Sequence, residues 1–333
     1  MARDGDQPSA TGLGLISMNN KHQPASANTY AVIVTYKPDL AALEAQLARL
    51  RPQVSAIAII DNASEETARI ALRDLAKRFD AMLLENENNL GIATALNQGI
   101  ACAREKGASH VLLMDQDSLP ANDMVEKLHA ALARLSMHEK VAAVGPVAED
   151  LRDGVLAPFV RVGFPLNRKI AVARGETVRC DFLITSGSLV PMAVIDSVGG
   201  MDEGLFIDNV DLEWSFRSAR AGHALYGIGD ARMGHRIGDG VRRLPLGASF
   251  VHSPVRLYYM MRNRILLYRR IATPWLWIAQ DIPRALLKLL RFSLLVRPRR
   301  ANALAMLAGV KDGLLGRTGA KSDNAAELSP YGR

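Results

Sequence analysis

HVLLMDQDS, at residues 110–118, joins a short apolar run to two carboxylates that lie one residue apart. The apolar run predicts a strand over His110–Met114, and the polar residues Asp115 and Asp117 follow directly after it. In open α/β sheets, ligands bind at the edge formed by the carboxyl ends of the strands. Asp115 and Asp117 are therefore candidate ligand-binding residues if the neighbouring sequence also forms a parallel sheet.

The sequence around this run alternates between strand and helix patterns. Tyr30–Thr35 is apolar and β-branched, which is typical of a strand buried on both faces. Leucines at helical spacing follow between Leu40 and Leu50. Alternating units of this length predict a mostly parallel, doubly wound sheet flanked by helices. Further strands are expected at Ala56–Ile60, Ala81–Leu84 and Val141–Val144, and further helices at Glu65–Phe79, Gly91–Lys106 and from Pro120 to about Met137.

The pattern changes after residue 150, where strands and helices no longer alternate regularly. From Arg256 onward the chain reads as helical, basic and apolar. Between these points we expect a β-rich stretch at Val178–Val190, helices at Pro191–Val198 and Phe206–Ala221, and short strands at Ala224–Ile228 and Ala231–His235.

The bulk composition is that of a globular protein. Hydrophobic residues make up 49% and charged residues 23% of the 333 residues, enough apolar material for a sizeable core. Cys102 and Cys180 form neither a metal pattern nor a disulfide framework. Residues 1–28 are polar and mixed, which predicts a disordered leader and not a signal peptide. No window reaches the roughly 18 to 20 apolar residues of a membrane-spanning helix.

Asp115 and Asp117 can face one hard cation from a strand end. Mg²⁺ or Mn²⁺ typically uses one or two carboxylates together with phosphate oxygens of a substrate. A solvated turn is the simpler explanation of such a pair alone. An aspartyl-phosphate hydrolase is the main competing phosphotransfer enzyme, but its aspartates follow the first strand, whereas this run follows the fourth and continues with Ser118.

Polar residues also follow the earlier strands. A carboxylate such as Asp61 can accept the ring N–H of a uracil or thymine base, and Tyr36 can stack on that base. Gly91 permits close backbone approach at a helix start, where N–H groups favour phosphate. Turn chemistry alone could explain each position. The set comprises Thr35, Tyr36, Asp61, Asn62, Asn89 and Gly91.

Asp208, Asp211 and Glu213 fall near one another at the start of the helix expected at Phe206–Ala221. Acidic residues there suit the helix dipole, but three of them exceed what capping needs. One of them could deprotonate an acceptor hydroxyl as a general base. Farther on, His235 follows a short strand, and neutral imidazole could complete the coordination of a cation held by Asp117. Arg236 could contact diphosphate oxygens.

As an ordered set, these motifs resemble the family-2 glycosyltransferases of the GT-A fold. The resemblance runs from about Tyr30 to Arg270, and within the family it is closest to bacterial rhamnosyltransferases, which add L-rhamnose to O-antigen, capsule or rhamnolipid acceptors. The most specific parts are residues 113–118, residues 205–214 with Trp214 at their end, and the run from His235 to Gly238.

The resemblance implies a role for each matching position. Asp117 and His235 would bind Mg²⁺ or Mn²⁺, and Asp115 would lie at the metal and the ribose. Asp211 would be the catalytic base of a single inverting displacement. Val210 stands where many members have Glu, a departure that the rhamnosyltransferase subgroup shares. Thr35, Tyr36, Asp61 and Asn62 would hold the nucleoside, Asn89, Gly91 and Arg236 the diphosphate region, and Asp208, Glu213 and Trp214 the acceptor or sugar.

The resemblance also divides the chain. Residues 29–255 would form the GT-A domain, with a nucleotide-binding half at 29–150 and an acceptor and catalytic half at 151–255. Residues 256–315 would form a basic amphipathic helical region, and residues 316–333 a disordered tail.

The net charge of +7 is concentrated in the helical region. Arg256 to Arg300 holds eleven Arg or Lys residues and one acid, interleaved with Trp and Leu. Such a segment suits a helix that lies in an anionic membrane interface, although an amphipathic helix packed on the domain would look similar. We expect a peripheral enzyme on the cytoplasmic face of a bacterial inner membrane. No recognition motif for nucleic acid accompanies the charge.

Three alternatives remain open. The same fold could use another nucleotide sugar, such as one carrying galactofuranose, glucose or N-acetylglucosamine. A nucleotidyltransferase fits less well, because Thr35-Tyr36-Lys37-Pro38 supplies no Gly-rich loop. An inactive membrane-docking scaffold would keep the fold without the activity. The sequence leaves open whether the acceptor is a lipid-linked oligosaccharide or a hydroxy-acyl lipid.

Overall fold

The structure is a computed structural model, and it describes residues 28–235, 241–244, 247–250 and 252–321. The predicted leader therefore lies outside the described residues except for Asn28, and so does the predicted tail beyond Lys321. The first part of that tail is described and packs on the domain, since the Gly319 amide donates to the carbonyl of Gly204 at 2.7 Å.

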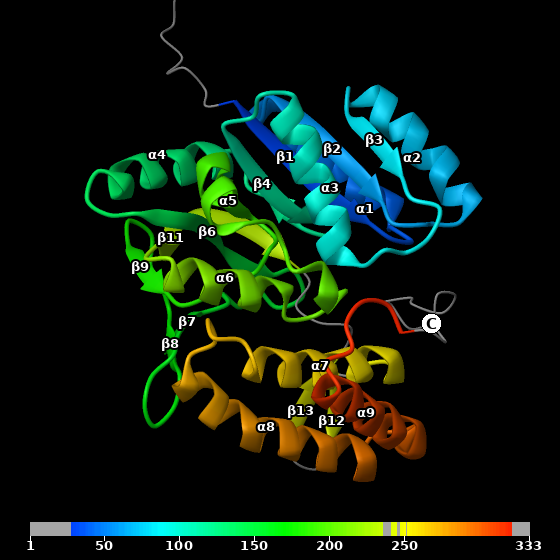
Figure 1. Cartoon of the computed structure of the whole chain (residues 1–333). Coiled ribbons are helices and arrows are strands. Elements are labelled where there is room, and N and C mark those ends of the chain that lie inside the picture. Colours follow the sequence, from blue (N-terminus) through cyan, green and yellow to red (C-terminus); the bar gives the residue numbers. More distant parts are fainter. Residues whose placement is uncertain (1–27, 236–240, 245–246, 251, 322–333) are drawn as a thin grey trace, which may run out of the picture.

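A mixed sheet forms the centre of the molecule (Figure 1). In the described part of the chain, its strands run in the order β3-β2-β1-β4-β10-β6-β11-β5, with β9 beside β11. Neighbours among β1 to β4 are parallel, as are β6 and β11, whereas β10 is antiparallel to both β4 and β6. The strands are β1 (Thr29–Thr35), β2 (Ala56–Asp61), β3 (Met82–Glu85), β4 (His110–Asp115), β5 (Leu119–Pro120), β6 (Val141–Asp150), β9 (Thr177–Cys180), β10 (Ser188–Pro191) and β11 (Ala224–His235).

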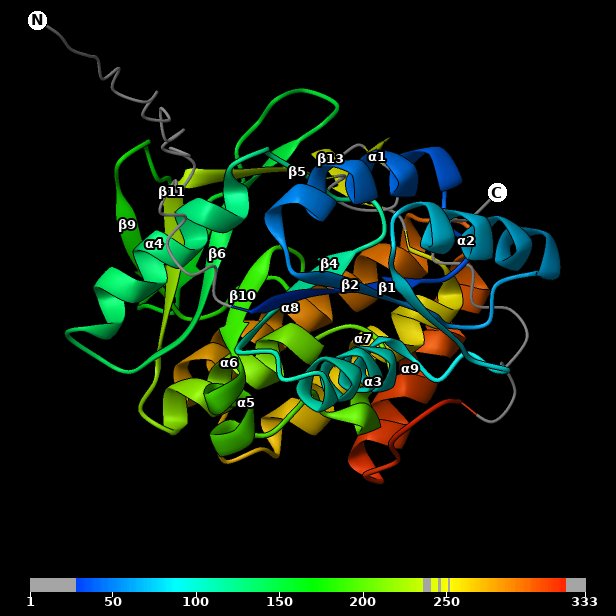
Figure 2. The same cartoon turned by 90° about the horizontal axis from the view of Figure 1, so that it is seen from above.

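Helices cover both faces of this sheet (Figures 1 and 2). One face packs on α1 (Leu40–Leu50), α2 (Glu66–Arg78) and α4 (Met124–Ser136). The other packs on α3 (Ile92–Glu105), α5 (Met192–Val198) and α6 (Val210–Arg220). Alternate residues of the central strands enter the two cores, as the side-chain period of a strand requires. The mostly parallel α/β prediction is confirmed.

Several boundaries differ from the predictions. Pro120 does not begin a helix: it lies in β5, which pairs with β11, and α4 begins at Met124. The stretch expected at Val178–Val190 is divided between β9 and β10, and the two short strands expected at 224–235 form one strand, β11, with a register irregularity. The helix expected from Phe206 begins only at Val210, because Phe206, Asp208 and Asn209 have positive φ.

Three helices form a carboxyl-terminal layer under the sheet domain (Figure 1). They are α7 (Pro254–Tyr268), α8 (Trp275–Leu294) and α9 (Arg299–Leu314). Gly309 and Gly313 lie one helical turn apart and let α9 contact the backbone of α7, since a Cβ at Gly313 would lie 2.8 Å from the carbonyl oxygen of Arg262. In the described residues, no helix combines the length and the apolar character that crossing a bilayer requires.

Two small hairpins complete the described chain. β7 (Phe159–Arg161) pairs with β8 (Arg168–Ile170), and β12 (Val241–Leu244) pairs with β13 (Gly247–Phe250). The side chain of Gln280 on α8 donates to the carbonyl of Gly163, so the β7–β8 hairpin is fixed to the carboxyl-terminal layer.

Candidate active site

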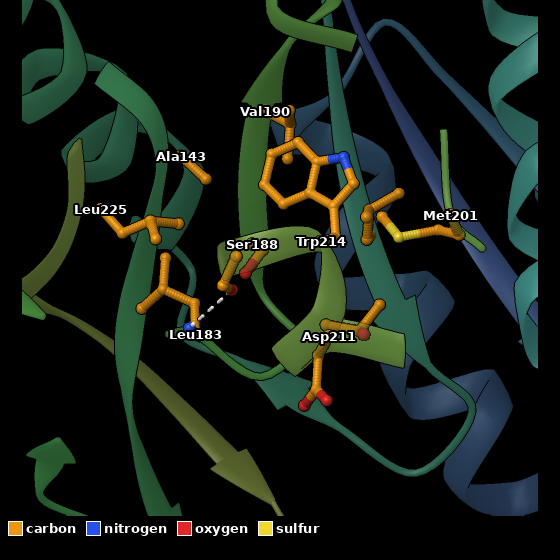
Figure 3. Close-up of a pocket in the computed structure, with 11 residues that line it drawn as sticks. Ala143, Leu183, Ser188, Val190, Met201, Asp211, Trp214 and Leu225 are labelled. Atoms are coloured by element: carbon orange, nitrogen blue, oxygen red, sulfur yellow. Dashed lines mark hydrogen bonds between the residues drawn. The ribbon is translucent and has the colours of Figure 1, made fainter. Parts of the chain in front are cut away.

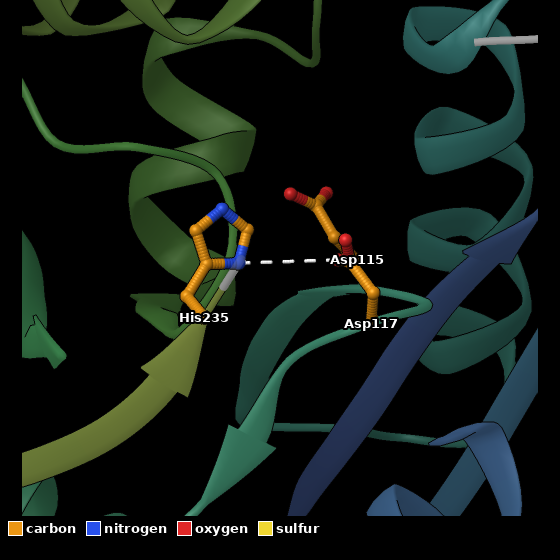
Figure 4. A group of neighbouring side chains, drawn as sticks. All are labelled: Asp115, Asp117 and His235. Carbon is orange, nitrogen blue, oxygen red and sulfur yellow. Dashed lines mark ion pairs between the residues drawn. The ribbon is translucent and has the colours of Figure 1, made fainter. Parts of the chain in front are cut away.

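Asp115, Asp117 and His235 converge at the carboxyl edge of the sheet (Figure 4). One ligand atom from each lies within 4.8 Å of the others, and His235 Nδ1 is 3.9 Å from Asp117 Oδ1. Asp115 ends β4 and His235 ends β11, and the antiparallel pairing of β5 with β11 joins the two strand ends. The register Gly234 to Leu119 explains how residues more than a hundred positions apart come together.

Hydrogen bonds from surrounding side chains fix the turn between β4 and β5. Ser118 Oγ lies 2.8 Å from His235 Nδ1 and 2.7 Å from Ser186 Oγ. The Gln46 amide donates to the carbonyls of Asp115 at 2.6 Å and Ser118 at 2.7 Å. Such contacts fix ligand side chains before a cation binds.

The electrostatics of this group fit a divalent cation. Burial raises the pKa of Asp115, the Asp117 carboxylate raises it further, and His235 and Arg256 oppose the rise. Two carboxylates close together destabilise each other's ionised form, and a bound cation relieves this repulsion. Two carboxylates and an imidazole are also donors that Mn²⁺ and Mg²⁺ accept. The residues present therefore fit such a metal.

Asp211 lies in the first turn of α6, close enough to Asp115 and Asp208 for their charges to interact. Burial raises its pKa to about 6, with the two neighbouring carboxylates acting in the same direction and the Leu212 amide opposing them. A carboxylate whose pKa lies near 6 can accept a proton from a hydroxyl more readily than an ordinary aspartate can.

The other acidic residues of this segment are paired. Arg256 of α7 binds Asp208 at 3.2 Å, and Arg217 binds Glu213 at 2.8 Å. Trp214 is buried, and its indole N–H donates to the carbonyl of Gly199 at 3.0 Å. Figure 3 shows its ring in a small, mostly apolar pocket under α6, with the Asp211 carboxylate pointing away from the ring. Glu213 and Trp214 thus support α6 in this structure, and their predicted acceptor contacts stay predictions.

The strand ends of the amino-terminal half form a connected polar cluster. Asp61 is fully buried and accepts hydrogen bonds from Thr35 Oγ1 at 3.0 Å and from the Ser64 amide at 2.9 Å. The Tyr36 amide donates to Gln116 Oε1 at 2.8 Å, which joins the end of β1 to the turn between β4 and β5. The structure therefore brings Thr35 and Asp61 together beside the acidic turn. Their contact with a nucleoside stays a prediction.

Asn62, Asn89 and Gly91 are also brought together. Asn62 Nδ2 donates to Asn89 Oδ1 at 2.9 Å, and the Gly91 amide donates to the same oxygen at 2.9 Å. Gly91 has φ +85°, and a Cβ there would lie 2.6 Å from the carbonyl oxygen of Phe206. Its close backbone approach is therefore to the segment before α6. Arg236 lies outside the described residues.

The residues that support this site were not among those predicted from the sequence. Gln46 and Ser186 are buried and bind the acidic turn, of which the buried Ser118 is part, and Arg262 and Asn263 on α7 bind the segment before α6. A signal was present in the sequence, because an Arg-Asn pair in a largely apolar helix needs hydrogen-bond partners if it is buried. The prediction treated Arg262 only as part of the basic charge after residue 256.

Comparisons with known proteins identify the family. The profile of Glycosyl transferase family 2 matches residues 30–152. The chain is also 34% identical over 306 residues to the dTDP-rhamnosyl transferase RfbF of Shigella flexneri, covering 90% of this chain and 100% of that protein.

Solved structures show the same fold. A structure of GalNAc-T7 with UDP, GalNAc and Mn²⁺ has a TM-score of 0.55 at 18% identity, covering 72% of this chain and 48% of that chain. The mannosyltransferase PcManGT of Pyrobaculum calidifontis, in complex with GDP-Man and Mn²⁺, has a TM-score of 0.50 at 15% identity, covering 87% of each chain. The GT-A-type architecture is thereby confirmed. The extent of the Shigella match decides the family: the chain belongs to glycosyl transferase family 2, and it is a glycosyltransferase.

Proposed function

We propose that this enzyme transfers L-rhamnose from dTDP-L-rhamnose to a hydroxyl of a membrane-associated glycan or lipid, by an inverting and divalent-metal-dependent reaction. The observation that carries the proposal is the convergence of Asp115, Asp117 and His235 beside Asp211. The printed activity of the Shigella relative supports the choice of donor.

In the proposed reaction, Asp211 takes the proton of the acceptor hydroxyl while the hydroxyl oxygen forms a bond to the anomeric carbon. The bond from that carbon to the diphosphate breaks in the same step, which inverts the anomeric configuration. Asp115, Asp117 and His235 would hold Mg²⁺ or Mn²⁺, which supplies positive charge for the departing diphosphate. Asp208 pairs with Arg256 and so holds the guanidinium group near the turn between β4 and β5.

The remaining predicted roles belong to the same proposal. Thr35 and Asp61 lie within one polar cluster, which supports a nucleoside site there. A buried carboxylate that accepts the ring N–H of thymine or uracil would suit a dTDP or a UDP donor, and the activity printed for the Shigella relative supports dTDP. The nucleoside is assigned to Thr35, Tyr36, Asp61 and Asn62, the diphosphate region to Asn89, Gly91 and Arg236, and the acceptor or sugar to Asp208, Glu213 and Trp214.

A donor panel tests this function. Purified enzyme with Mn²⁺ or Mg²⁺ should hydrolyse or transfer from dTDP-L-rhamnose at least about tenfold faster than from nucleotide-linked galactofuranose, glucose or N-acetylglucosamine, because a site built for one sugar leaves polar groups unpaired with another. The measurement is nucleotide release, followed by product analysis with membranes as acceptor. Faster turnover of another donor would overturn the rhamnose assignment, and failure to bind any nucleotide diphosphate would favour an inactive scaffold.

The carboxyl-terminal layer supports a position at the membrane. Exposed apolar residues at helical spacing form a stripe along α8, which we call the α8 stripe and define as Trp275, Ile282, Leu286, Leu290 and Leu294. Exposed arginines follow it at Arg297, Arg299 and Arg300. Phe164 and Leu166, at the tip of the hairpin fixed to α8, are exposed too. Apolar side chains beside arginines suit an anionic lipid interface.

The helix α7 is buried to a greater extent than α8. The helix α7 buries Leu257, Tyr259 and Leu267, and it packs on the sheet domain and on α9. Within the predicted membrane-associating region of 256–315, we therefore assign the contact with lipid to α8 and its arginines.

We expect the enzyme to co-sediment with phosphatidylcholine vesicles that contain phosphatidylglycerol, and more weakly with pure phosphatidylcholine or at high salt. Leu286→Glu should lower vesicle binding about tenfold, because it places a charge in the α8 stripe. Ile70→Glu on α2 is the matched control, since Ile70 is 60% exposed and Leu286 56% exposed. Equal binding of both variants would remove the α8 stripe from the interface.

A further inference from the structure

The segment that leads into α6 has a strained backbone. Phe206 has φ +64° and ψ −66°, and the Ile207 amide donates to the carbonyl of Leu205 at 2.8 Å, so these residues form a γ-turn. Asp208 and Asn209 also have φ +64°. Such conformations are unfavourable for residues other than glycine and persist only where surrounding contacts hold them. Asp211 follows two residues after Asn209.

Asn263 of α7 holds this strained segment directly. Its side-chain amide lies within hydrogen-bond distance of three acceptors, the carbonyls of Leu205 at 2.8 Å, Ile207 at 2.7 Å and Asp208 at 2.9 Å. Asn263 is 0% exposed, so these bonds are shielded from bulk solvent. An amide has two N–H donors, and here they are shared among the three carbonyls.

Arg262 holds Asn263 and the preceding turn. Its Nε donates to Asn263 Oδ1 at 3.0 Å, which fixes the orientation of the amide. Its Nη2 donates to the carbonyls of Leu205 at 2.9 Å and Gly204 at 3.2 Å, and its Nη1 to that of Gly319 at 2.5 Å. With 1% exposure, the guanidinium is buried among carbonyl oxygens that offset its desolvation.

Aromatic and backbone contacts fix the same segment from two further sides. The ring of Phe206 stacks on Tyr259 of α7, with centroids 5.0 Å apart. The carbonyl of Phe206 accepts from the Ile92 amide of α3 at 2.7 Å. The segment is thus connected to α7 by side chains and to α3 by its backbone.

We infer that Arg262 and Asn263 are positioning residues that set the place of the Asp211 carboxylate at the reacting hydroxyl. The inference rests on the proposed role of Asp211 as the base. Asn209, in the left-handed conformation, precedes α6 without a side-chain capping bond. The first turn of α6 therefore takes its direction from the segment that α7 holds. Loss of the Asn263 amide releases the γ-turn and displaces Asp211.

Asn263→Ala tests the inference. A displacement of a catalytic group by about 1 Å costs on the order of 100-fold in rate. We expect kcat for sugar transfer to fall about 100-fold, with the KM for the donor within about twofold, because the proposed nucleoside residues Thr35 and Asp61 lie on β1 and β2, which Asn263 does not bind. Asn263→Ser keeps one hydrogen-bond donor, the hydroxyl, and its kcat should lie between those of the wild type and Asn263→Ala.

Asn302→Ala is the matched control. Asn302 is also 0% exposed and donates to two backbone carbonyls, Val296 at 3.0 Å and Phe292 at 3.4 Å, within the carboxyl-terminal layer. Its loss should lower the melting temperature to a similar degree and leave kcat within about twofold. Equal kcat losses in Asn263→Ala and Asn302→Ala would show a general effect of destabilisation and would overturn the inference.

A double-mutant cycle separates positioning from folding. In an Asp211→Asn background, Asn263→Ala should cause no further loss of kcat, because the group that it positions is gone. An additive 100-fold loss would overturn the inference. The proposed function fails differently, since wild-type enzyme would then transfer no sugar from dTDP-L-rhamnose; wild-type transfer that Asn263→Ala leaves unchanged would defeat the positioning role alone.

Discussion

Asp211→Asn should lower sugar transfer about 1,000-fold and leave donor binding within about threefold. General-base catalysis contributes about 10² to 10⁴ in rate, and the amide cannot accept the hydroxyl proton. Asp211 lies close to Asp115 but outside the group formed by Asp115, Asp117 and His235, so the metal ligands stay in place. The measurements are kcat with saturating acceptor and donor affinity by calorimetry. A variant that keeps a tenth of wild-type turnover would reject the base assignment.

The role of Asp211 as a base predicts that activity rises with pH. The pKa of Asp211 is raised to about 6, mainly by burial, so the carboxylate is protonated and inactive below that pH. We expect kcat/KM of the wild-type enzyme at saturating Mn²⁺ to rise as pH rises through about 6, because kcat/KM reports the free enzyme. The saturating cation keeps Asp115 ionised, so the residual rate of the Asp211→Asn variant should lack this limb.

The same substitution should stabilise the fold. The folded pKa of Asp211 lies above its unfolded value of 3.8, so the ionised carboxylate destabilises the protein at pH 7, and that cost fades as pH falls below about 6. Asp211→Asn should therefore melt at a higher temperature than wild type at pH 7.5, with a smaller difference at pH 5. Glu213→Gln, on the same helix, should melt lower, because it breaks the pair with Arg217.

Hydrophobic pattern alone placed most of the central sheet. The predicted limits of β1, β2 and β4 agree with the structure within one residue, because strands buried on both faces are continuous apolar runs. The acidic turn after β4 and His235 after β11 were also predicted, since each follows an apolar run directly. Their convergence within 4.8 Å was expected from the chemistry of imidazole and carboxylate ligands and from the family resemblance, and not from the hydrophobic pattern.

Non-local contacts determine what the sequence did not predict. Proline at residue 120 favours a helix start, but the pairing of β5 with β11 overrides that preference. Helix propensity alone would extend α6 back to Phe206. The segment before Val210 is instead held in γ-turn and left-handed conformations by Asn263, more than fifty residues later. Gln46, Ser118 and Ser186 likewise come from three separate parts of the chain: α1, the turn before β5 and the turn before β10. Local propensity carries no information about such partners.

Asp117→Asn should weaken the affinity of the enzyme for divalent cations and remove most of its activity. Wild-type transfer should stop in excess EDTA and return with Mn²⁺ or Mg²⁺. In the Asp117→Asn variant, we expect the Mn²⁺ concentration for half-maximal rate to rise at least about 100-fold. Loss of a residue that only orients a metal ligand already lowers metal affinity or activity about 10- to 100-fold, and here a ligand itself is lost. Asp123→Asn is the matched control: Asp123 precedes α4 and pairs with Lys127 on the surface.

Melting temperature gives a test of the metal site that needs no turnover. A cation that binds only the folded protein raises its stability with concentration. Here the gain should be enlarged, because the cation also offsets the two effects that raise the pKa of Asp115, its burial and, to a smaller degree, the repulsion from Asp117. Millimolar Mn²⁺ should therefore raise the melting temperature of wild type and Asp123→Asn, but not of Asp117→Asn or His235→Ala. A shift that survives both site substitutions would mean that the ion binds elsewhere, and the activity loss of Asp117→Asn would then need another cause.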